Sequence, residues 1–170
     1  MNILLTGFMG AGKTTVGRKL AKRLGYFFID TDQEIEKEQG CSINDIFKYG
    51  GESCFRDMET DLLKRLQSRK NSVLATGGGM VMRSQNRKLM QYLGKRVYLK
   101  VSFEEIFRRM RKDEKRPLFQ QDEEKIREIL EERIPIYEQA ECIIDTHNMN
   151  SSPCLLYTSD AADDTPWVDL

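Results

Sequence analysis

Residues 7–14, Gly-Phe-Met-Gly-Ala-Gly-Lys-Thr, match the pattern G-x-x-x-x-G-K-[ST], which constrains this chain more than any other feature. In such a loop the glycines let successive backbone N–H groups turn inward around a phosphate group. A lysine at the position of Lys13 reaches the β- and γ-phosphates of a nucleotide, and a hydroxyl at the position of Thr14 ligates Mg²⁺. The chain is therefore expected to bind a nucleotide through its phosphates.

The surroundings of the loop fit this interpretation. Residues 2–6 form a short apolar run that predicts a buried strand, and residues 13–24 predict a helix with one apolar face. The amino end of that helix directs its positive dipole end at the same anion. A glycine-rich turn without function is the alternative, but strand, loop and helix are all present in the required order.

Strand and helix patterns alternate along the rest of the chain, which predicts an α/β fold with a parallel sheet between two layers of helices. A helix after residue 30 is expected to be capped by Thr31 or Asp32, with Glu34 completing a capping box. Pro135 is expected to kink or end the last helix. The remaining strands are expected at 26–30, 72–76, 96–100 and 141–145, the first of them buried, and the remaining helices at 43–47, 55–66, 83–92, 103–110 and 123–139.

Composition excludes several classes of function. Lys plus Arg and Asp plus Glu both total 27, so no net positive field attracts nucleic acid or an acidic membrane. No apolar run approaches the ~20 residues that span a bilayer. One histidine and four cysteines without C-x-x-C spacing argue against a zinc site. The first strand leaves no room for a signal peptide, so a cytoplasmic protein with reduced thiols is expected.

Residues 151–170 differ from the rest of the chain. They contain two prolines, show no helical or strand period, and carry only Asp as charged residues. We interpret this tail as non-native or disordered, and we expect one domain over residues 1–150.

Two carboxylates follow the second predicted strand, where an open parallel sheet binds its ligands. Asp30 and Asp32 stand two residues apart, and in an extended segment their side chains project to the same side. One could hold Mg²⁺, directly or through water, while the other orients or deprotonates an acceptor hydroxyl. The alternative is that Asp32 serves only as the cap of the next helix.

Arginines and glycines supply the other candidate site residues. Arg56 stands three residues before Glu59 on a predicted helix, either in a surface ion pair or as an anion ligand. Three glycines at 77–79 follow the third strand and allow a ligand to approach the backbone, although a simple turn would also use them.

The charged stretch at 111–125 is a further candidate, with Arg116 near its middle and Arg133 on the helix after it. A basic flexible segment of this kind can close over ATP as a mobile lid and bring an arginine to the transferring phosphoryl group. A solvated loop is the alternative.

Taken in order, these motifs resemble those of the shikimate kinase family, in the nucleoside-monophosphate-kinase-like branch of P-loop proteins. The resemblance spans residues 1 to about 149 and implies a three-layer P-loop fold. Its five-stranded parallel sheet carries a small substrate-binding helical insert at about 32–62. The motifs are Gly7–Thr15, Asp30-Thr-Asp32, Gly51-Glu52 with Phe55-Arg56, Thr76–Gly79, Arg116-Pro-Leu118 and Arg133-x-Pro135-x-Tyr137.

The resemblance implies that the chain phosphorylates a hydroxyl of shikimate with ATP, giving shikimate 3-phosphate and ADP. One Mg²⁺ ion is implied on Thr14 and, through water, on Asp30. Arg109 is implied to flank adenine, and Arg116 to reach the phosphates from the lid. A monomer is implied as well. The implied ATP ligands are Gly10, Ala11, Gly12, Lys13, Thr14, Thr15, Arg109 and Arg116.

On the acceptor side, the resemblance implies that two arginines grip the carboxylate of shikimate, which suits the planar fork of donors on each guanidinium. Asp32 is implied to bind hydroxyls and to act as, or stand in for, the general base. Glu59 is implied to support Arg56. The implied shikimate ligands are Asp32, Arg56, Gly78, Gly79 and Arg133, and the implied catalytic residues are Lys13, Asp32 and Arg116.

Other functions stay open at this stage. In the family, the segment after the last strand contributes to the adenine pocket and forms a final helix, which residues from about 151 do not predict. A kinase for gluconate or a nucleoside monophosphate is one alternative, and a nucleotide-binding module without catalysis is another. Asp32, Arg56 and Arg133 together favour a carboxylated ring over a nucleotide, and less strongly over gluconate.

Overall fold

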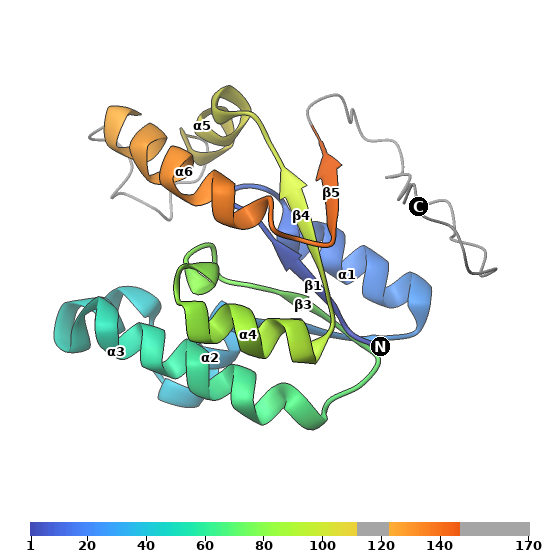
Figure 1. Cartoon of the computed structure of the whole chain (residues 1–170). Coiled ribbons are helices and arrows are strands. Elements are labelled where there is room, and N and C mark those ends of the chain that lie inside the picture. The colour runs from blue at the N-terminus through green and yellow to red at the C-terminus, as the bar shows by residue number, and fades with distance from the viewer. Residues whose placement is uncertain (112–122, 147–170) are drawn as a thin grey trace.

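Five parallel strands form the central layer of the protein, in the order β2-β3-β1-β4-β5 (Figure 1). The computed structural model describes residues 1–111 and 123–146 of the 170. All four strand pairs are parallel, with Leu5 of β1 opposite Ala75 of β3 and Val97 of β4. The predicted five-stranded parallel sheet is confirmed. The strands are β1 Ile3–Thr6, β2 Phe27–Asp30, β3 Ser72–Ala75, β4 Lys95–Lys100 and β5 Cys142–Asp145.

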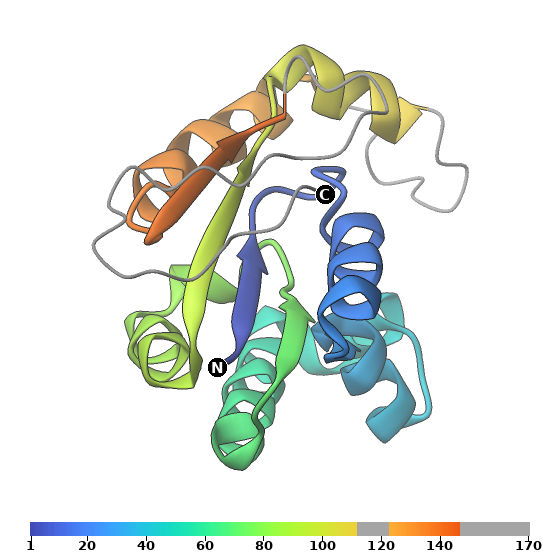
Figure 2. The same cartoon turned by 90° about the vertical axis from the view of Figure 1, so that its right-hand side faces the viewer.

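Helices cover both faces of this sheet. Helix α1 lies on one face, and α3 and α4 lie over the other, so the protein has three layers (Figures 1 and 2). Within the described ranges, no helix is both long and apolar enough to span a membrane. The helices are α1 Lys13–Leu24, α2 Thr31–Gln39, α3 Ile43–Arg65, α4 Ser84–Leu93, α5 Phe103–Arg111 and α6 Glu123–Tyr137, with short 3₁₀ helices η1 Leu66–Ser68 and η2 Met80–Met82.

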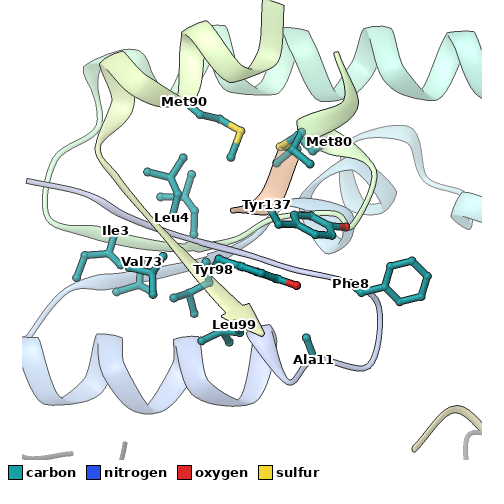
Figure 3. Packing of buried hydrophobic residues seen from close by; sticks show 14 of the residues in the cluster. Ile3, Leu4, Phe8, Ala11, Val73, Met80, Met90, Tyr98, Leu99 and Tyr137 are labelled. Carbon is teal, nitrogen blue, oxygen red and sulfur yellow. The ribbon is translucent and has the colours of Figure 1, made fainter. Parts of the chain in front are cut away.

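The core lies against the central strands, which are covered on both faces. Every residue of β1 and β3 is buried, as expected for strands inside a parallel sheet. The rings of Tyr98 on β4 and Tyr137 on α6 stack with their centroids 5.1 Å apart, beside Met80 and Phe8 (Figure 3). This packing fixes the end of α6 over the carboxyl ends of the strands.

The sequence did not predict every element correctly. Strand β2 is only partly buried, because it lies at the edge of the sheet: Ile29 belongs to the core, but Phe27 is 63% exposed. Helix α6 continues past Pro135 and ends at Tyr137. The two helices expected on either side of the Gly50-Gly51 pair are present, but they run into one another as α3 with a kink at Gly51, where φ is 74°.

Helices α2 and α3 occupy the predicted insert at about 32–62 and share a small core of their own, formed by Ile35, Ile46, Phe55 and Leu62. The boundaries of that insert stay a prediction. Residues 112–122 of the predicted lid, Arg116 among them, and the predicted tail at 151–170 lie outside the described residues.

Candidate active site

The phosphate loop joins β1 to α1 at the centre of the sheet. Gly10 and Gly12 adopt positive φ angles of 76° and 89°, which turn the backbone into the first turn of α1. In the described structure no side chain caps α1 at Gly12, so the first N–H groups of the helix are available to an anion. The Nζ of Lys13 donates hydrogen bonds of 2.8 Å to the carbonyl oxygens of Gly7 and Phe8. The lysine charge therefore lies over the loop.

Thr14 and Asp30 form the part of the site that fits a metal ion. The Thr14 hydroxyl donates to Asp30 Oδ2 at 2.7 Å, and Asp30 is the last residue of β2. Mg²⁺ prefers hard oxygen ligands, and in kinases it is held by one or two protein groups together with substrate phosphates. A hydroxyl and a carboxylate beside the phosphate loop meet that requirement.

The two aspartates of the Asp30-Thr-Asp32 motif point to different places. Asp30 is the N-cap of α2 and accepts a hydrogen bond from the backbone N–H of Gln33, so the predicted cap at Thr31 or Asp32 is wrong. The argument that both carboxylates project to one side of an extended segment also fails, because the helix begins at Thr31. Asp30 faces Thr14, and Asp32 lies beside Gly77.

The turn at Gly77–Gly79 lies against the residues predicted to bind the phosphoryl acceptor, which we call the acceptor side. A Cβ on Gly77 would stand 2.5 Å from Asp32 Oδ1 and 3.0 Å from Glu59 Oε1, and a Cβ on Gly79 would overlap the guanidinium of Arg56. A side chain at either position would force these groups to move from where they lie. The turn is tied to the start of α2, because the Gly77 N–H donates to the Thr31 hydroxyl at 2.9 Å.

Gly78 is where the acceptor side meets the phosphate loop. A Cβ on this residue would stand 3.4 Å from the backbone nitrogen of Met9 and 3.7 Å from Nη1 of Arg133. The guanidinium carbon of Arg133, on α6, also lies 5.6 Å from the centroid of the Phe8 ring. The structure therefore brings Arg133 to the glycine turn and to the loop that follows β1.

Arg56 is held by carboxylates on both sides. Its Nη1 donates to both oxygens of Glu59, at 2.9 and 3.0 Å, and its Nε and Nη2 donate to Glu52 Oε1 at 3.2 and 2.9 Å. The Glu59 side chain is fully buried, whereas that of Glu52 is 65% exposed. The expected pair of Arg56 with Glu59 is present, and it lies inside the protein rather than on its surface.

Burial raises the pKa of Glu59 to about 7, and the charge of Asp32 adds to the rise, while Arg56 opposes it. Between pH 4.5 and 7 the folded protein therefore binds more protons at this site than the unfolded chain, so the stability falls as the pH rises. A Glu59→Gln variant should lose this decline. Thermal unfolding from pH 4.5 to 8 measures it, and a variant that declines as steeply as the wild type would contradict the raised pKa.

The remaining nucleotide-side residues divide into two groups. Arg109 on α5 donates through Nη1 to the Gly10 carbonyl at 3.0 Å and through Nε to Glu105 at 2.6 Å, so it lies against the phosphate loop. Its predicted contact with adenine stays a prediction. Arg116 falls outside the described residues, and its role stays a prediction as well.

Sequence reasoning missed two buried polar residues, Thr60 and Asn86, which join α3 to α4 and to the 3₁₀ helix η2 that follows the glycine turn. The Thr60 hydroxyl donates to Asn86 Oδ1 at 2.7 Å, and the Asn86 amide donates to the Met80 carbonyl at 3.1 Å. Both side chains are buried and lie 26 residues apart in the sequence. The one available signal was an asparagine within an otherwise amphipathic helix, which does not identify its partner.

Fold and site together define a class of protein. A phosphate loop at the centre of a parallel sheet lies beside a glycine turn that gathers one aspartate and two arginines, as in P-loop kinases of small molecules. The chain belongs to the shikimate kinase family, since the family model for shikimate kinase matches residues 9–161. It is a kinase.

Individual relatives agree with this family. The chain is 45% identical to a shikimate kinase of Thermodesulfovibrio yellowstonii over 150 residues, which cover 87% of each protein. A shikimate kinase of Persephonella marina is 46% identical over 145 residues, covering 85% of this chain and 88% of that protein. The solved structure of Acinetobacter baumannii shikimate kinase in complex with shikimate superposes with a TM-score of 0.82 at 46% identity, covering 87% and 84% of the two chains.

Proposed function

We propose that this chain transfers the γ-phosphoryl group of ATP to a hydroxyl of shikimate, giving shikimate 3-phosphate and ADP. The observation that supports this most strongly is the Gly77–Gly79 turn, which gathers Asp32, Arg56 and Arg133 beside the phosphate loop. Shikimate 3-phosphate is a precursor of aromatic amino acids, and the cytoplasmic location stays an expectation.

The residues gathered at the Gly77–Gly79 turn have the chemistry that shikimate requires. Shikimate carries one carboxylate and three hydroxyls. Arg56 and Arg133 supply fixed cations for the carboxylate, and Asp32, as an ionised carboxylate, accepts hydrogen bonds from hydroxyls. In the reaction one acceptor hydroxyl attacks the γ-phosphorus, the bond to the β-phosphate oxygen breaks, and the hydroxyl proton passes to Asp32 or to solvent.

The phosphate side neutralises charge and aligns the reacting groups. Lys13 and the amides of the loop bind the phosphates, and Thr14 and Asp30 are the residues that would hold Mg²⁺, Asp30 through water. When bound, the ion offsets negative charge on the β- and γ-phosphates. Phosphoryl transfer asks little covalent chemistry of the protein, so positioning and electrostatics account for most of the rate.

The direct test measures ADP release from MgATP with shikimate, gluconate, a nucleoside monophosphate or no acceptor. We expect ADP release only in the reaction that contains shikimate as the acceptor. Turnover with gluconate or a nucleoside monophosphate would identify a related kinase instead. ATP binding without turnover on any acceptor would indicate a silent nucleotide-binding module.

Arg133→Ala should raise the KM for shikimate by about 10- to 100-fold, since a hydrogen bond to a charged group is worth ~1.5–3 kcal/mol. The KM for ATP should change little, because Arg133 is proposed to hold only the acid. Steady-state kinetics with each substrate varied in turn provides the measurement. Arg127→Ala is the control, because it also removes an arginine from α6. The Arg127 side chain lies over the Phe103 ring instead of beside Gly78. An equal rise in both KM values would place Arg133 on the nucleotide or in folding.

A further inference from the structure

We propose that Tyr137 is a positioning residue for the acceptor, whose hydroxyl holds the Arg133 guanidinium and the Gly78 peptide in a fixed relation. This inference rests on the proposed function and assigns a role to a residue that is not itself a proposed ligand of either substrate.

The position of Tyr137 fixes the direction of its hydroxyl. It is the last residue of α6 and is 1% exposed. Its ring stacks on Tyr98 with an interplanar angle of 22°, and Figure 3 shows its hydroxyl directed toward the side on which Phe8 lies. Arg133 stands four residues earlier on the same helix, so the two side chains lie on one face.

The hydroxyl joins two groups whose chemistry sets the order of the hydrogen bonds. The Gly78 carbonyl can only accept, so the Tyr137 hydroxyl donates to it. Arg133 can only donate, and it lies beside the same peptide, since its Nη1 is 3.7 Å from where a Cβ on Gly78 would stand and its charge opposes the rise that burial causes in the pKa of Tyr137. In the proposed relay Arg133 donates to the phenol oxygen and Tyr137 donates to the Gly78 carbonyl, and neither bond can reverse.

The phenol keeps its proton under ordinary conditions. Burial raises the pKa of Tyr137 to about 12, against the opposing effect of Arg133. The hydrogen donated to Gly78 is therefore present throughout the physiological pH range, and the relay does not depend on pH.

The Tyr137–Gly78 hydrogen bond also sets the direction of the Gly79 N–H, a second proposed ligand of the acceptor, because the peptide bond between Gly78 and Gly79 is planar. The Gly78 carbonyl and the Gly79 N–H belong to one trans peptide unit and point in opposite directions. Because Tyr137 holds the carbonyl, the Gly79 N–H is directed away from α6, and Gly79 is the residue that lies against Arg56. One phenol thus orients the acceptor arginine and a backbone donor of the same pocket, which reduces the ordering needed when the acceptor binds.

Tyr137→Phe removes the hydroxyl and keeps the stacked ring. We expect the KM for shikimate to rise about 5- to 10-fold, which corresponds to one ordinary hydrogen bond, with the KM for ATP unchanged. Tyr98→Phe is the matched control, since it removes a hydroxyl from the other ring of the same stack. A lower unfolding temperature with both KM values unchanged, or an equal rise in both, would overturn the proposal by making Tyr137 merely structural.

A double-mutant cycle with Arg133→Ala tests the relay itself. If Tyr137 acts partly through Arg133, the effect of Tyr137→Phe on the KM for shikimate becomes smaller in the Arg133→Ala background. Additive effects would overturn the relay. The wild type separates this result from the function itself: absence of shikimate-dependent ADP release there refutes the proposed function, and this inference with it, before any variant is measured.

Discussion

Replacing Lys13 with alanine should lower kcat by about 10³-fold or more, because it removes the positive charge proposed to bind the β- and γ-phosphates. An arginine that stabilises the charge of such a transition state contributes about 10³–10⁵ in rate, and the loss of a lysine charge should act in the same direction. In the structure the Lys13 ammonium lies on the Gly7 and Phe8 carbonyls, over the phosphate loop. Shikimate-dependent ADP release under saturating substrates measures the effect.

The matched control is Lys19→Ala, which removes an exposed lysine from the same helix. It should leave kcat within about twofold, as expected for a surface substitution. Thermal unfolding of Lys13→Ala should show a folded protein, since the loop backbone is shaped by its glycines. Activity of Lys13→Ala within twofold of the wild type would refute the assignment of the loop.

The phosphate loop could be predicted because its information is local. Eight consecutive residues specify the turn, the lysine and the start of the helix, and the flanking apolar patterns give the strand and helix. The five parallel strands follow from the same alternation, which leaves few topologies for a chain of this size. The glycine turn after β3 could be placed at the ligand edge for the same reason.

The directions of side chains were harder to predict. The sequence argument assumed an extended segment through Asp32, but the helix begins at Thr31, which sends Asp30 and Asp32 to different groups. The Arg56–Glu59 pair has the spacing of a surface ion pair, and only the packing of α3 against α2 and α4 shows that Glu59 is buried. Burial depends on the tertiary structure, so helical spacing alone cannot give it.

Apart from the Arg56–Glu59 pair, the supporting contacts could not be predicted, because their partners are remote in the sequence. The Tyr137 hydroxyl donates to the carbonyl of Gly78, which stands 59 residues earlier in the sequence. The buried Arg96 donates to Glu141, which stands 45 residues later, after α6. No periodicity connects such pairs. The sequence therefore indicated the residues proposed to touch substrate and missed most of those that hold them in place.

Asp32→Asn should lower kcat by about 10²–10⁴-fold, the usual contribution of a general base, and should also raise the KM for shikimate. The amide keeps the size of the side chain beside Gly77 but loses the negative charge that attracts and accepts a hydroxyl proton. The KM for ATP should change little, since Asp32 faces the glycine turn and Asp30 faces Thr14. Asp61→Asn, at an exposed position on α3, is the control.

The alternative role of Asp32 as a helix cap makes a different prediction, because it requires a loss of stability without a selective loss of rate. Asp30 holds the cap, so Asp32→Asn should change the unfolding temperature only slightly at neutral pH. It should also lower the pKa of Glu59, since the charge of Asp32 is one of the causes that raise it. The decline in stability with rising pH would still begin near pH 4.5, which the unfolded chain sets, but it would end at a lower pH than in the wild type. A shift of this kind, together with the loss of kcat, would place Asp32 beside Glu59 by a measurement independent of catalysis. Unchanged kinetics with a large loss of stability would instead indicate that Asp32 serves only as a helix cap.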